Sequence, residues 1–422
     1  MIAFVLGTLV VLLFLGIPVA HAIGLESMIY MLRSGIDLSA IPQKFYVGVD
    51  SFTLLALPGF MLAGNLMNQG GITVRIVDFC KKLLGNIRGA LGIANVVASM
   101  IFGGISGSAV GDTASIGAIL IPAMKKEGYP ADYSVGVTAA SSCLAPVIPP
   151  SIGMIVIGGC CSLSVGKLFV AGAIPGILLG LLQCGMALFI AYKDGHPRGV
   201  KCSLSEKLKA VYDSFWALLM VVIVLVGILS GIVTPTEASV VSALYALVAG
   251  MFIYKELKVK DLPGIIVESM IQAAQALVIN GFAAGFAWLL ARDQIPSSIA
   301  NSILSLTDNK WLILLLINIL LIFVGMFMET ISSLLILMPI LLPIAHVIGM
   351  DSIQFAVMCM VNLTLGLATP PVGVCLSLAS SIGEISLSKG TKGILPFYLC
   401  GLIVLILVAT VPQVTLFLAS FV

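Results

Sequence analysis

The chain has 422 residues, of which 60% are hydrophobic and only 9% charged, and its mean hydropathy is +1.17. A soluble core of this length would carry far more charge, so the composition predicts a polytopic membrane protein. The formal net charge of +2 gives no support to a nucleic-acid or acidic partner. The nine cysteines lie mostly within apolar runs without paired spacing, which predicts neither a disulfide framework nor a metal site.

The chain opens with an apolar segment, 2–23, that has no basic leading region and is long enough to cross a bilayer. We therefore expect a retained first helix and not a cleaved signal. Amphipathic stretches are expected at 26–44 and 72–88, and the second, which is basic, is expected to lie along the membrane interface. Further spans are expected, in order, at 51–67, 168–192, 215–232, 237–254, 269–291 and 394–420.

The stretch 96–159 does not fit a simple span. The apolar runs on either side of Ser106 are too short to cross alone, since a transmembrane helix needs about 20 apolar residues. We expect a re-entrant hairpin over about 89–124 that turns at Ser106-Gly107-Ser108. Prolines at 146, 149 and 150 break the next helix, expected over about 133–159. Non-helical backbone at membrane depth survives only where protein buries it or water reaches it, so the two breaks indicate a binding site.

The same pattern occurs twice. When the chain is laid on itself ungapped, with Pro343 against Pro122, the register (an offset of 221) pairs Gly104 with Gly325, Gly128 with Gly349, Pro149-Pro150 with Pro370-Pro371, and Pro175 with Pro396. Because glycine and proline mark turns and breaks, this agreement indicates that the same order of turns and helix breaks occurs twice in the chain. A second hairpin is therefore expected over about 311–343 and a second broken helix over about 353–382.

The predicted fold class is an all-α polytopic membrane protein with an inverted-topology repeat, two re-entrant hairpins and two broken helices. Five expected crossings separate the hairpins, and an odd number inverts the second copy, as in many secondary transporters. The chain divides into three units. The first repeat covers 1–192, and the second repeat covers 236–422. Between them, 193–235 contains a cytoplasmic basic loop (193–209) and a linking helix (215–232).

Orientation follows from the basic residues, which favour the cytoplasmic side. A cytoplasmic N-terminus and an external C-terminus place 16 of the 21 lysines and arginines inside. The remaining five are Arg33, Lys44, Lys167, Arg292 and Lys310. The first hairpin would then enter from the cytoplasm and the second from outside.

The hairpin tips and helix breaks offer clustered oxygens, which is what a hard cation such as Na⁺ requires, while helix N-termini favour anions. The candidate Na⁺ ligands are Ser106, Gly107, Ser108, Pro146, Glu329, Thr330, Gly366 and Thr369. The candidate substrate residues are Ser106, Ser151, Arg292 and Gly373, because freed N–H groups after a break attract a carboxylate. Alternatives remain open: the small tip residues could serve close helix packing, Glu329 could hold its hairpin by hydrogen bonds, and Arg292 could be an interfacial anchor. Asp112 and the Arg292-Asp293 pair are further charges within apolar runs, and such charges are costly unless functional.

An enzyme is the competing class. Gly104-Ile105-Ser106-Gly107 fits the short motif of rhomboid-type intramembrane serine proteases, which need a histidine base at membrane depth. The three histidines are His21, His196 and His346. Only His346 is conceivable, and it is expected on the opposite side from the first hairpin. An ATP-driven pump is disfavoured because Gly166-Lys167-Leu168 lacks the hydroxyl of a phosphate loop.

Four motifs carry a family resemblance: 104–112 (GISGSAVGD), 145–150 (APVIPP), 234–237 (TPTE) and 368–371 (ATPP). Over essentially its whole length the chain resembles the large membrane (DctM-like) subunit of TRAP, tripartite ATP-independent periplasmic, transporters. The resemblance implies a Na⁺-driven importer of organic anions, such as C4-dicarboxylates or sialic acids, in the bacterial inner membrane. It also implies an elevator-like movement and two partners, a small four-helix membrane subunit, expected as a separate polypeptide, and a periplasmic binding protein. The fold also resembles stand-alone Na⁺/divalent-anion symporters, the runner-up.

Overall fold

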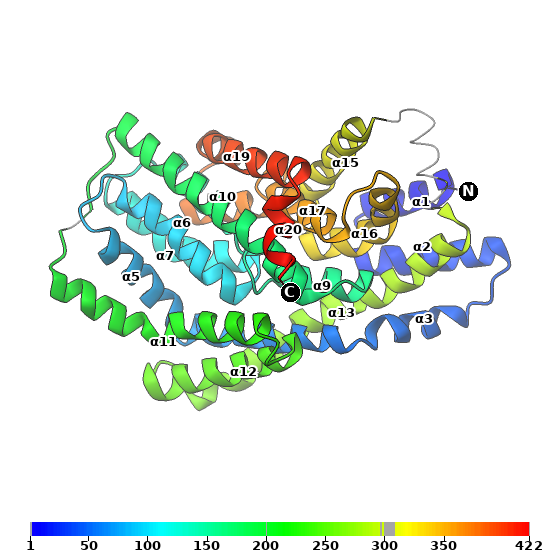
Figure 1. Ribbon diagram of the computed structural model, residues 1–422, viewed down its shortest axis with the longest axis horizontal. Helices are drawn as coiled ribbons and strands as arrows, with labels where there is room; N and C mark the ends of the chain where they lie inside the picture. Colours follow the sequence, from blue (N-terminus) through cyan, green and yellow to red (C-terminus); the bar gives the residue numbers. More distant parts are fainter. Residues whose placement is uncertain (1, 200, 296–297, 299–308, 422) are drawn as a thin grey trace.

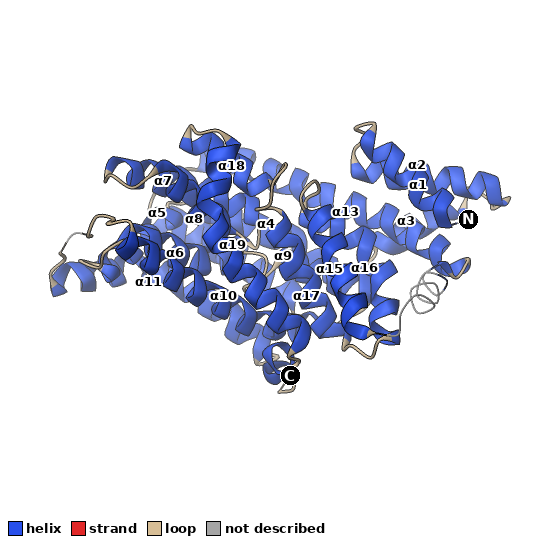
Figure 2. Cartoon of the chain, turned by 90° about the horizontal axis from the view of Figure 1, so that it is seen from above, coloured by secondary structure: helices blue, strands red, loops and turns tan. Residues whose placement is uncertain are grey.

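The structure, a computed structural model, describes residues 2–199, 201–295, 298 and 309–421. The described residues form a bundle of helices (Figures 1 and 2), as the composition predicts. Among them, six helices are long and apolar enough to cross a membrane. They are α10 (Val165–Lys193), α11 (Leu204–Leu229), α12 (Pro235–Val248) with its continuation to Ile253, α13 (Leu262–Arg292), α16 (Thr330–Val347) and α19 (Leu387–Thr410). The count becomes seven if α3 (Ala40–Val49) and the segment Phe52–Gln69, which contains α4 (Ala56–Gln69), form one span bent by 60°.

The prediction of a single first span over 2–23 is wrong. The segment divides into α1 (Ile2–Phe14) and α2 (Val19–Ser34), separated by Gly16, which has a φ of +80°, and Pro18. A left-handed glycine ends one helix and a proline starts the next, so the hydrogen-bond ladder cannot run through. The 13 residues of α1 rise only about 20 Å, which is short of the hydrocarbon thickness.

Two further boundaries differ from the prediction. The basic segment expected as a loop over 193–209 is helical from Leu204, because Ser203 and Glu206 form a capping box that starts α11. The last predicted span, 394–420, is interrupted before Pro412, so that α19 ends at Thr410 and a short helix, α20 (Gln413–Ala419), follows.

The predicted turns and breaks fall between helices. The structure has α6 (Ala90–Ser106) and α7 (Ala109–Lys126) joined at Gly107, and α15 (Lys310–Gly325) followed after a short turn by α16. It has the half-helix pairs α8 (Ala131–Ser142) and α9 (Ile152–Cys161), then α17 (Ser352–Gly366) and α18 (Val374–Gly383). The residues between the half-helices contain the prolines at 146, 149 and 150 and those at 370 and 371.

The core forms where α8 and α17 are enclosed. Every residue from Tyr133 to Ser142 is buried, as is every residue from Gln354 to Gly366. Helices that are enclosed on all sides have no solvent face to pattern, which explains their lack of amphipathic periodicity. Around them α7 packs on α18 while α9 packs on α16, and α8 packs on α19 while α10 packs on α17.

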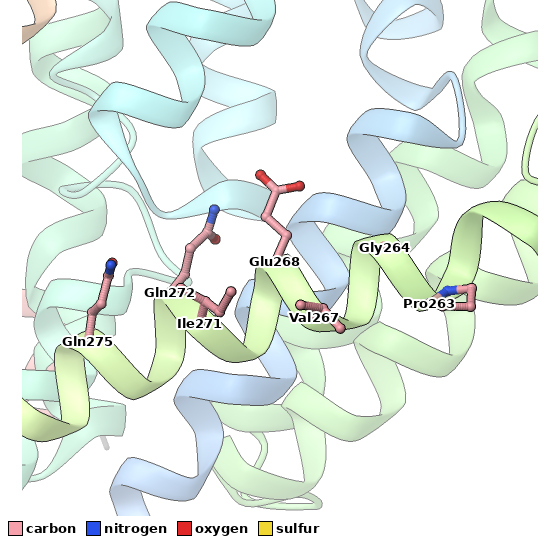
Figure 3. Close-up of a pocket in the computed structure, with 7 residues that line it drawn as sticks. All are labelled: Pro263, Gly264, Val267, Glu268, Ile271, Gln272 and Gln275. Atoms are coloured by element: carbon pink, nitrogen blue, oxygen red, sulfur yellow. The ribbon is translucent and has the colours of Figure 1, made fainter.

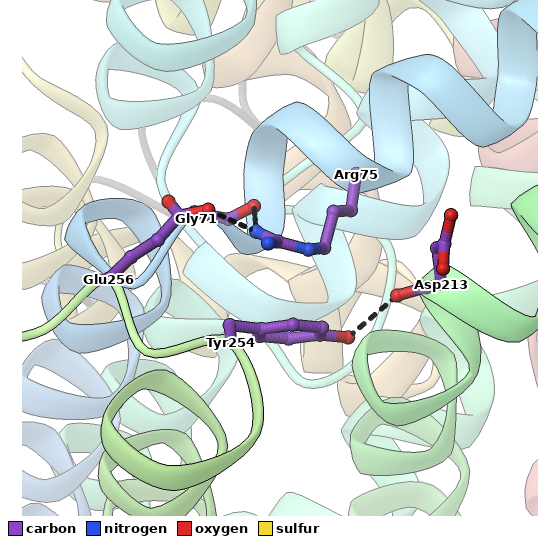
Figure 4. Close-up of polar contacts among 5 residues, drawn as sticks. All are labelled: Gly71, Arg75, Asp213, Tyr254 and Glu256. Carbon is purple, nitrogen blue, oxygen red and sulfur yellow. Dashed lines mark hydrogen bonds and ion pairs between the residues drawn. The ribbon is translucent and has the colours of Figure 1, made fainter.

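A second group of helices, α3, α4, α12 and α13, packs together, and α11 packs on α5 (Ile72–Leu84). Arg75 of α5 pairs with Glu256, with Nη1 and Oε1 2.6 Å apart, and its guanidinium lies 4.1 Å from the centre of the Tyr254 ring. Tyr254 in turn donates a hydrogen bond to the backbone carbonyl of Asp213 (Figure 4). The amphipathic helix is thereby tied to α11 and to the chain after α12. Since the ion pair is partly exposed, its net contribution to stability is about 1 kcal/mol or less.

Candidate functional site

A cavity of about 1100 Å³ lies where the two helix turns meet. Its walls come from the first turn of α2, one face of α4, the α6–α7 turn, the start of α9, a stretch of α13, and the start of α16. Six of the predicted site residues line it: Ser106, Gly107, Ser108, Pro146, Glu329 and Thr330. Segments more than 200 residues apart in the sequence therefore share one cavity.

The first turn, from Ser106 to Ser108, is built from short side chains and bare backbone. Gly107 has a φ of +58°, and its N–H donates to the carbonyl of Gly103 at 2.9 Å, which closes α6. Ser108 starts α7, and its hydroxyl accepts the Gly111 N–H at 3.2 Å. A Cβ on Gly107 would lie 2.8 Å from the nitrogen of Ile152, so the turn approaches the start of α9 as closely as backbone allows.

The second turn uses a carboxylate where the first uses a hydroxyl. Glu329 caps α16, and its Oε2 accepts the N–H groups of Ile331 at 2.8 Å and Ser332 at 3.2 Å. Ser108 and Glu329 are paired by the 221-residue register, so equivalent positions cap equivalent helices. Beside Glu329, the hydroxyl of Thr330 is buried and finds no hydrogen-bond partner among the described residues. A buried hydroxyl without a protein partner is a position that a water molecule or a bound ligand can satisfy.

Five predicted residues do not line this cavity. Ser151 is buried behind it, where it caps α9 and donates to the carbonyl of Pro146. Thr369 donates to the carbonyl of Leu365 at 2.7 Å, and the N–H of Gly373 donates to the carbonyl of Met326 at 3.1 Å.

Gly366 packs against Gly325, where an added Cβ would lie 2.6 Å from backbone atoms. The fifth residue, Arg292, is exposed at the end of α13, with its guanidinium 6.0 Å from the centre of the Trp288 ring. This placement favours the interfacial-anchor interpretation of Arg292 over an attraction for the substrate.

The sequence analysis missed a polar stripe on α13. Glu268, Gln272 and Gln275 share one helix face, line the cavity, and continue into a shallow hollow along the helix (Figure 3). Asn65 of α4 donates to the hydroxyl of Ser269 at 2.8 Å and to Oε1 of Gln272 at 3.3 Å. A carboxylate directly before the span predicted at 269–291, followed by amides four and seven residues later, was the signal that could have revealed the stripe.

The charges of the cavity are unbalanced. Its lining residues include two carboxylates, Glu268 and Glu329, and one imidazole, His21, but no lysine or arginine among the described residues. An organic anion that enters such a site meets negative charge in a low-dielectric environment. Accompanying cations are the direct way to offset that repulsion.

Asp112 lies behind the first turn and not in the cavity lining. It is fully buried, and its Oδ2 accepts the hydroxyl of Ser99 at 2.8 Å. Ser99 continues to Ser141 at 3.0 Å, and Ser141 to Asn95 at 3.1 Å. This network ties α6, α7 and α8 together and supports the turn from behind.

The described residues contain no group of three or more His, Cys, Asp and Glu side chains that could hold a metal ion. A cation between the two turns would therefore rely mainly on hydroxyl and backbone oxygens, with the carboxylate of Glu329 at the second turn. Such a donor set suits a monovalent hard cation better than a transition metal.

Comparisons with known proteins agree along the whole chain. The family model described as "Tripartite ATP-independent periplasmic transporter, DctM component" matches residues 6–414. The sialic acid TRAP transporter large permease protein SiaM of Vibrio cholerae is 41% identical over 96% of each chain. The C4-dicarboxylate TRAP transporter large permease protein DctM of Rhodobacter capsulatus is 35% identical over 99% of this chain and 98% of the relative.

A solved structure shares the fold. The crystal structure of the YdaH transporter of Alcanivorax borkumensis matches with a TM-score of 0.59, covering 87% of this chain and 86% of that chain at 16% identity. At that identity the likeness shows the fold alone.

Proposed function

The chain belongs to the DctM family of TRAP-transporter large permease subunits, and from this premise we propose that it imports an organic anion by symport with Na⁺. As a multi-pass permease of this family it is not an enzyme, which removes the intramembrane-protease alternative. Membership also favours a transporter with further components over the stand-alone symporter. The proposed partners are a small four-helix membrane subunit and a periplasmic binding protein.

The charge of the shared cavity carries the proposal. Two carboxylates and no lysine or arginine line the described part of a site that must accept an anion. Na⁺ bound between the turns supplies the missing positive charge and couples the anion to the sodium gradient. The buried, unpaired hydroxyl of Thr330 supports a ligand at this position.

The proposed Na⁺ ligands divide between the two turns. Ser106, Gly107 and Ser108, with the carbonyl of Pro146, serve one site, and Glu329 with Thr330 serves its counterpart. Gly366 and Thr369 do not line the cavity, but Leu367 beside them does, so the C-terminal end of α17 adds the negative end of a helix dipole. The anion is placed at the start of α9, where Ile152 and Gly153 line the cavity just after Ser151, because N–H groups at a helix start favour negative charge.

We further propose that the two sets of elements are an inverted repeat, with the N-terminus cytoplasmic and the C-terminus periplasmic. The packing supports the inverted repeat, because α7 of the first set packs on α18 of the second while α16 of the second set packs on α9 of the first. Such a pairing is expected when a two-fold axis relates two copies. An elevator-like movement of these elements against α3, α4, α12 and α13 would then alternate the access to the cavity.

The substrate class is proposed from the relatives. SiaM is named for sialic acid and DctM for C4-dicarboxylates, and both ligands carry carboxylates. We therefore propose a carboxylate-bearing solute of one of these two classes.

The test is uptake into proteoliposomes that contain the chain and its small subunit, supplied with binding protein loaded with radiolabelled sialic acid or succinate. Uptake should require an inward Na⁺ gradient and should disappear when K⁺ replaces Na⁺. Omission of either partner should reduce it to background. Uptake that ignores Na⁺ would refute the coupling, and robust uptake by the isolated chain would refute the proposed partners.

A further inference from the structure

We propose that His21 is the side chain that pairs with a carboxylate of the transported anion and thereby selects anions in the cavity. The proposal rests on the proposed function and names a residue for its substrate. No motif in the sequence distinguishes His21, which lies within an apolar run near the N-terminus.

The position of His21 follows from how α2 packs. A Cβ at Gly24 would lie 3.0 Å from the Phe282 ring, and Tyr30 donates a hydrogen bond to Asp293. The later residue of α2 contacts the later residue of the α13 segment, so the two helices run in the same direction. His21 therefore lies level with Ile279, and both residues line the cavity.

This position separates His21 from one of the two carboxylates of the cavity. Glu268 lies about 16 Å earlier along α13, at 1.5 Å per residue. In contrast, Glu329 belongs to the second turn, and His21 and Glu329 line the same cavity from different elements. His21 thus shares the cavity with the second proposed Na⁺ site.

The chemistry of the position suits an anion. His21 is exposed, and it is the one basic side chain among the described residues that line the cavity. An imidazole donates an N–H in either protonation state, and as an imidazolium it forms a charge-assisted bond to a carboxylate. The first N–H groups of α2 have no partner within the helix, and Val19 and Ala20 line the cavity beside His21. The transported anion therefore meets two groups that favour negative charge on the walls of one cavity, the imidazole of His21 and the N–H groups at the start of α9.

The test measures binding directly, in the purified complex of the chain with its small subunit and without binding protein. Radiolabelled sialic acid and succinate are the probes, titrated at saturating Na⁺. His21→Phe keeps a planar ring but removes both nitrogens, and it should raise Kd for the bound acid about tenfold. His21→Arg should restore most of the affinity. The Na⁺ concentration for half-maximal binding should stay within about twofold of the wild-type value, because the Na⁺ ligands are untouched.

His346→Phe is the matched control. His346 also lies near a helix end and hydrogen-bonds Ser352 at 2.7 Å, but it is not among the residues that line the cavity. This variant should bind the acid as the wild type does. Wild-type affinity in His21→Phe, an equal loss in His346→Phe, or a parallel loss of Na⁺ affinity would each overturn the role of His21.

Failure of the two proposals can be told apart. If the wild-type complex takes up neither acid, or takes one up without any dependence on Na⁺, the proposed function fails and the role of His21 fails with it. If the wild type binds and transports the acid while His21→Phe binds it equally well, only the role of His21 is lost.

Discussion

Replacing Gly107 by alanine tests whether the first turn holds a coupling cation. Gly107 has a φ of +58°, where an L-residue pays about 1–2 kcal/mol for its Cβ. The new Cβ would also lie 2.8 Å from the nitrogen of Ile152, whereas ordinary contact begins at 3.4 Å, so the turn must move by about 0.6 Å. Ligand groups have to stay within about 0.5 Å of their productive positions. The substitution therefore displaces Ser106 and Ser108 beyond that tolerance without removing either hydroxyl.

The expected result is a rise of about tenfold in the Na⁺ concentration for half-maximal uptake, since each 1.4 kcal/mol corresponds to a factor of ten. The assay is initial uptake into proteoliposomes across a series of inward Na⁺ gradients, with the protein amount and the elution profile of the complex matched to wild type. Gly185→Ala is the control, because Gly185 lies on the exposed face of α10 and an added Cβ there meets nothing within 4 Å.

A Gly107→Ala protein with the Na⁺ dependence of Gly185→Ala would refute the reasoning. It would mean that the first turn tolerates a shift of half an ångström, which a cation site does not. Loss of folding in Gly107→Ala would show as an altered elution profile, and the companion substitution Ser106→Ala, which leaves the backbone path intact, would then decide.

Three further outcomes are expected. Glu329→Gln should raise the Na⁺ requirement at least as much as Ser106→Ala, because it removes a charge while an amide oxygen can still cap α16; wild-type behaviour of both variants in the uptake series would contradict the proposed ligands. In a cysteine-free background, Gly195→Cys should be protected from an impermeant thiol reagent applied from outside and Asn309→Cys should react, whereas the reverse pattern would invert the orientation. His196, buried 4.4 Å from the Tyr133 ring after α10, has its pKa lowered by burial. The unfolded loop therefore binds the proton more readily, and stability should fall as the pH drops from about 6.5 towards the lowered pKa. His196→Phe should flatten that acid loss in thermal melts of the detergent-solubilised protein, and an unchanged slope would count against it.

The turns and breaks were readable from the sequence because they are set locally. Gly107 must adopt a left-handed conformation to reverse the chain, and the clustered prolines at 146, 149–150 and 370–371 remove backbone donors and so disfavour a continuous helix, whereas a single proline such as Pro175 lies inside α10. The same local rule applies to Gly16 and Pro18, but the continuous apolar run over 2–23 led to the prediction of one span in place of the two helices α1 and α2. Hydropathy also indicated the approximate limits of α10, α12 and α13, since a bilayer demands a minimum apolar length.

Only the tertiary structure decided which of these local features meet. Ser106 and Glu329 share a cavity because α7 packs on α18 and α16 on α9, contacts between segments whose separation in the chain says nothing about distance. Arg292 and Glu268 both belong to α13, yet the sequence favoured the first and overlooked the second. Position along a helix relative to its neighbours decides which side chains reach a cavity, and that position follows from packing: α13 presents Glu268, Gln272 and Gln275 to the turns and carries Arg292 beyond them.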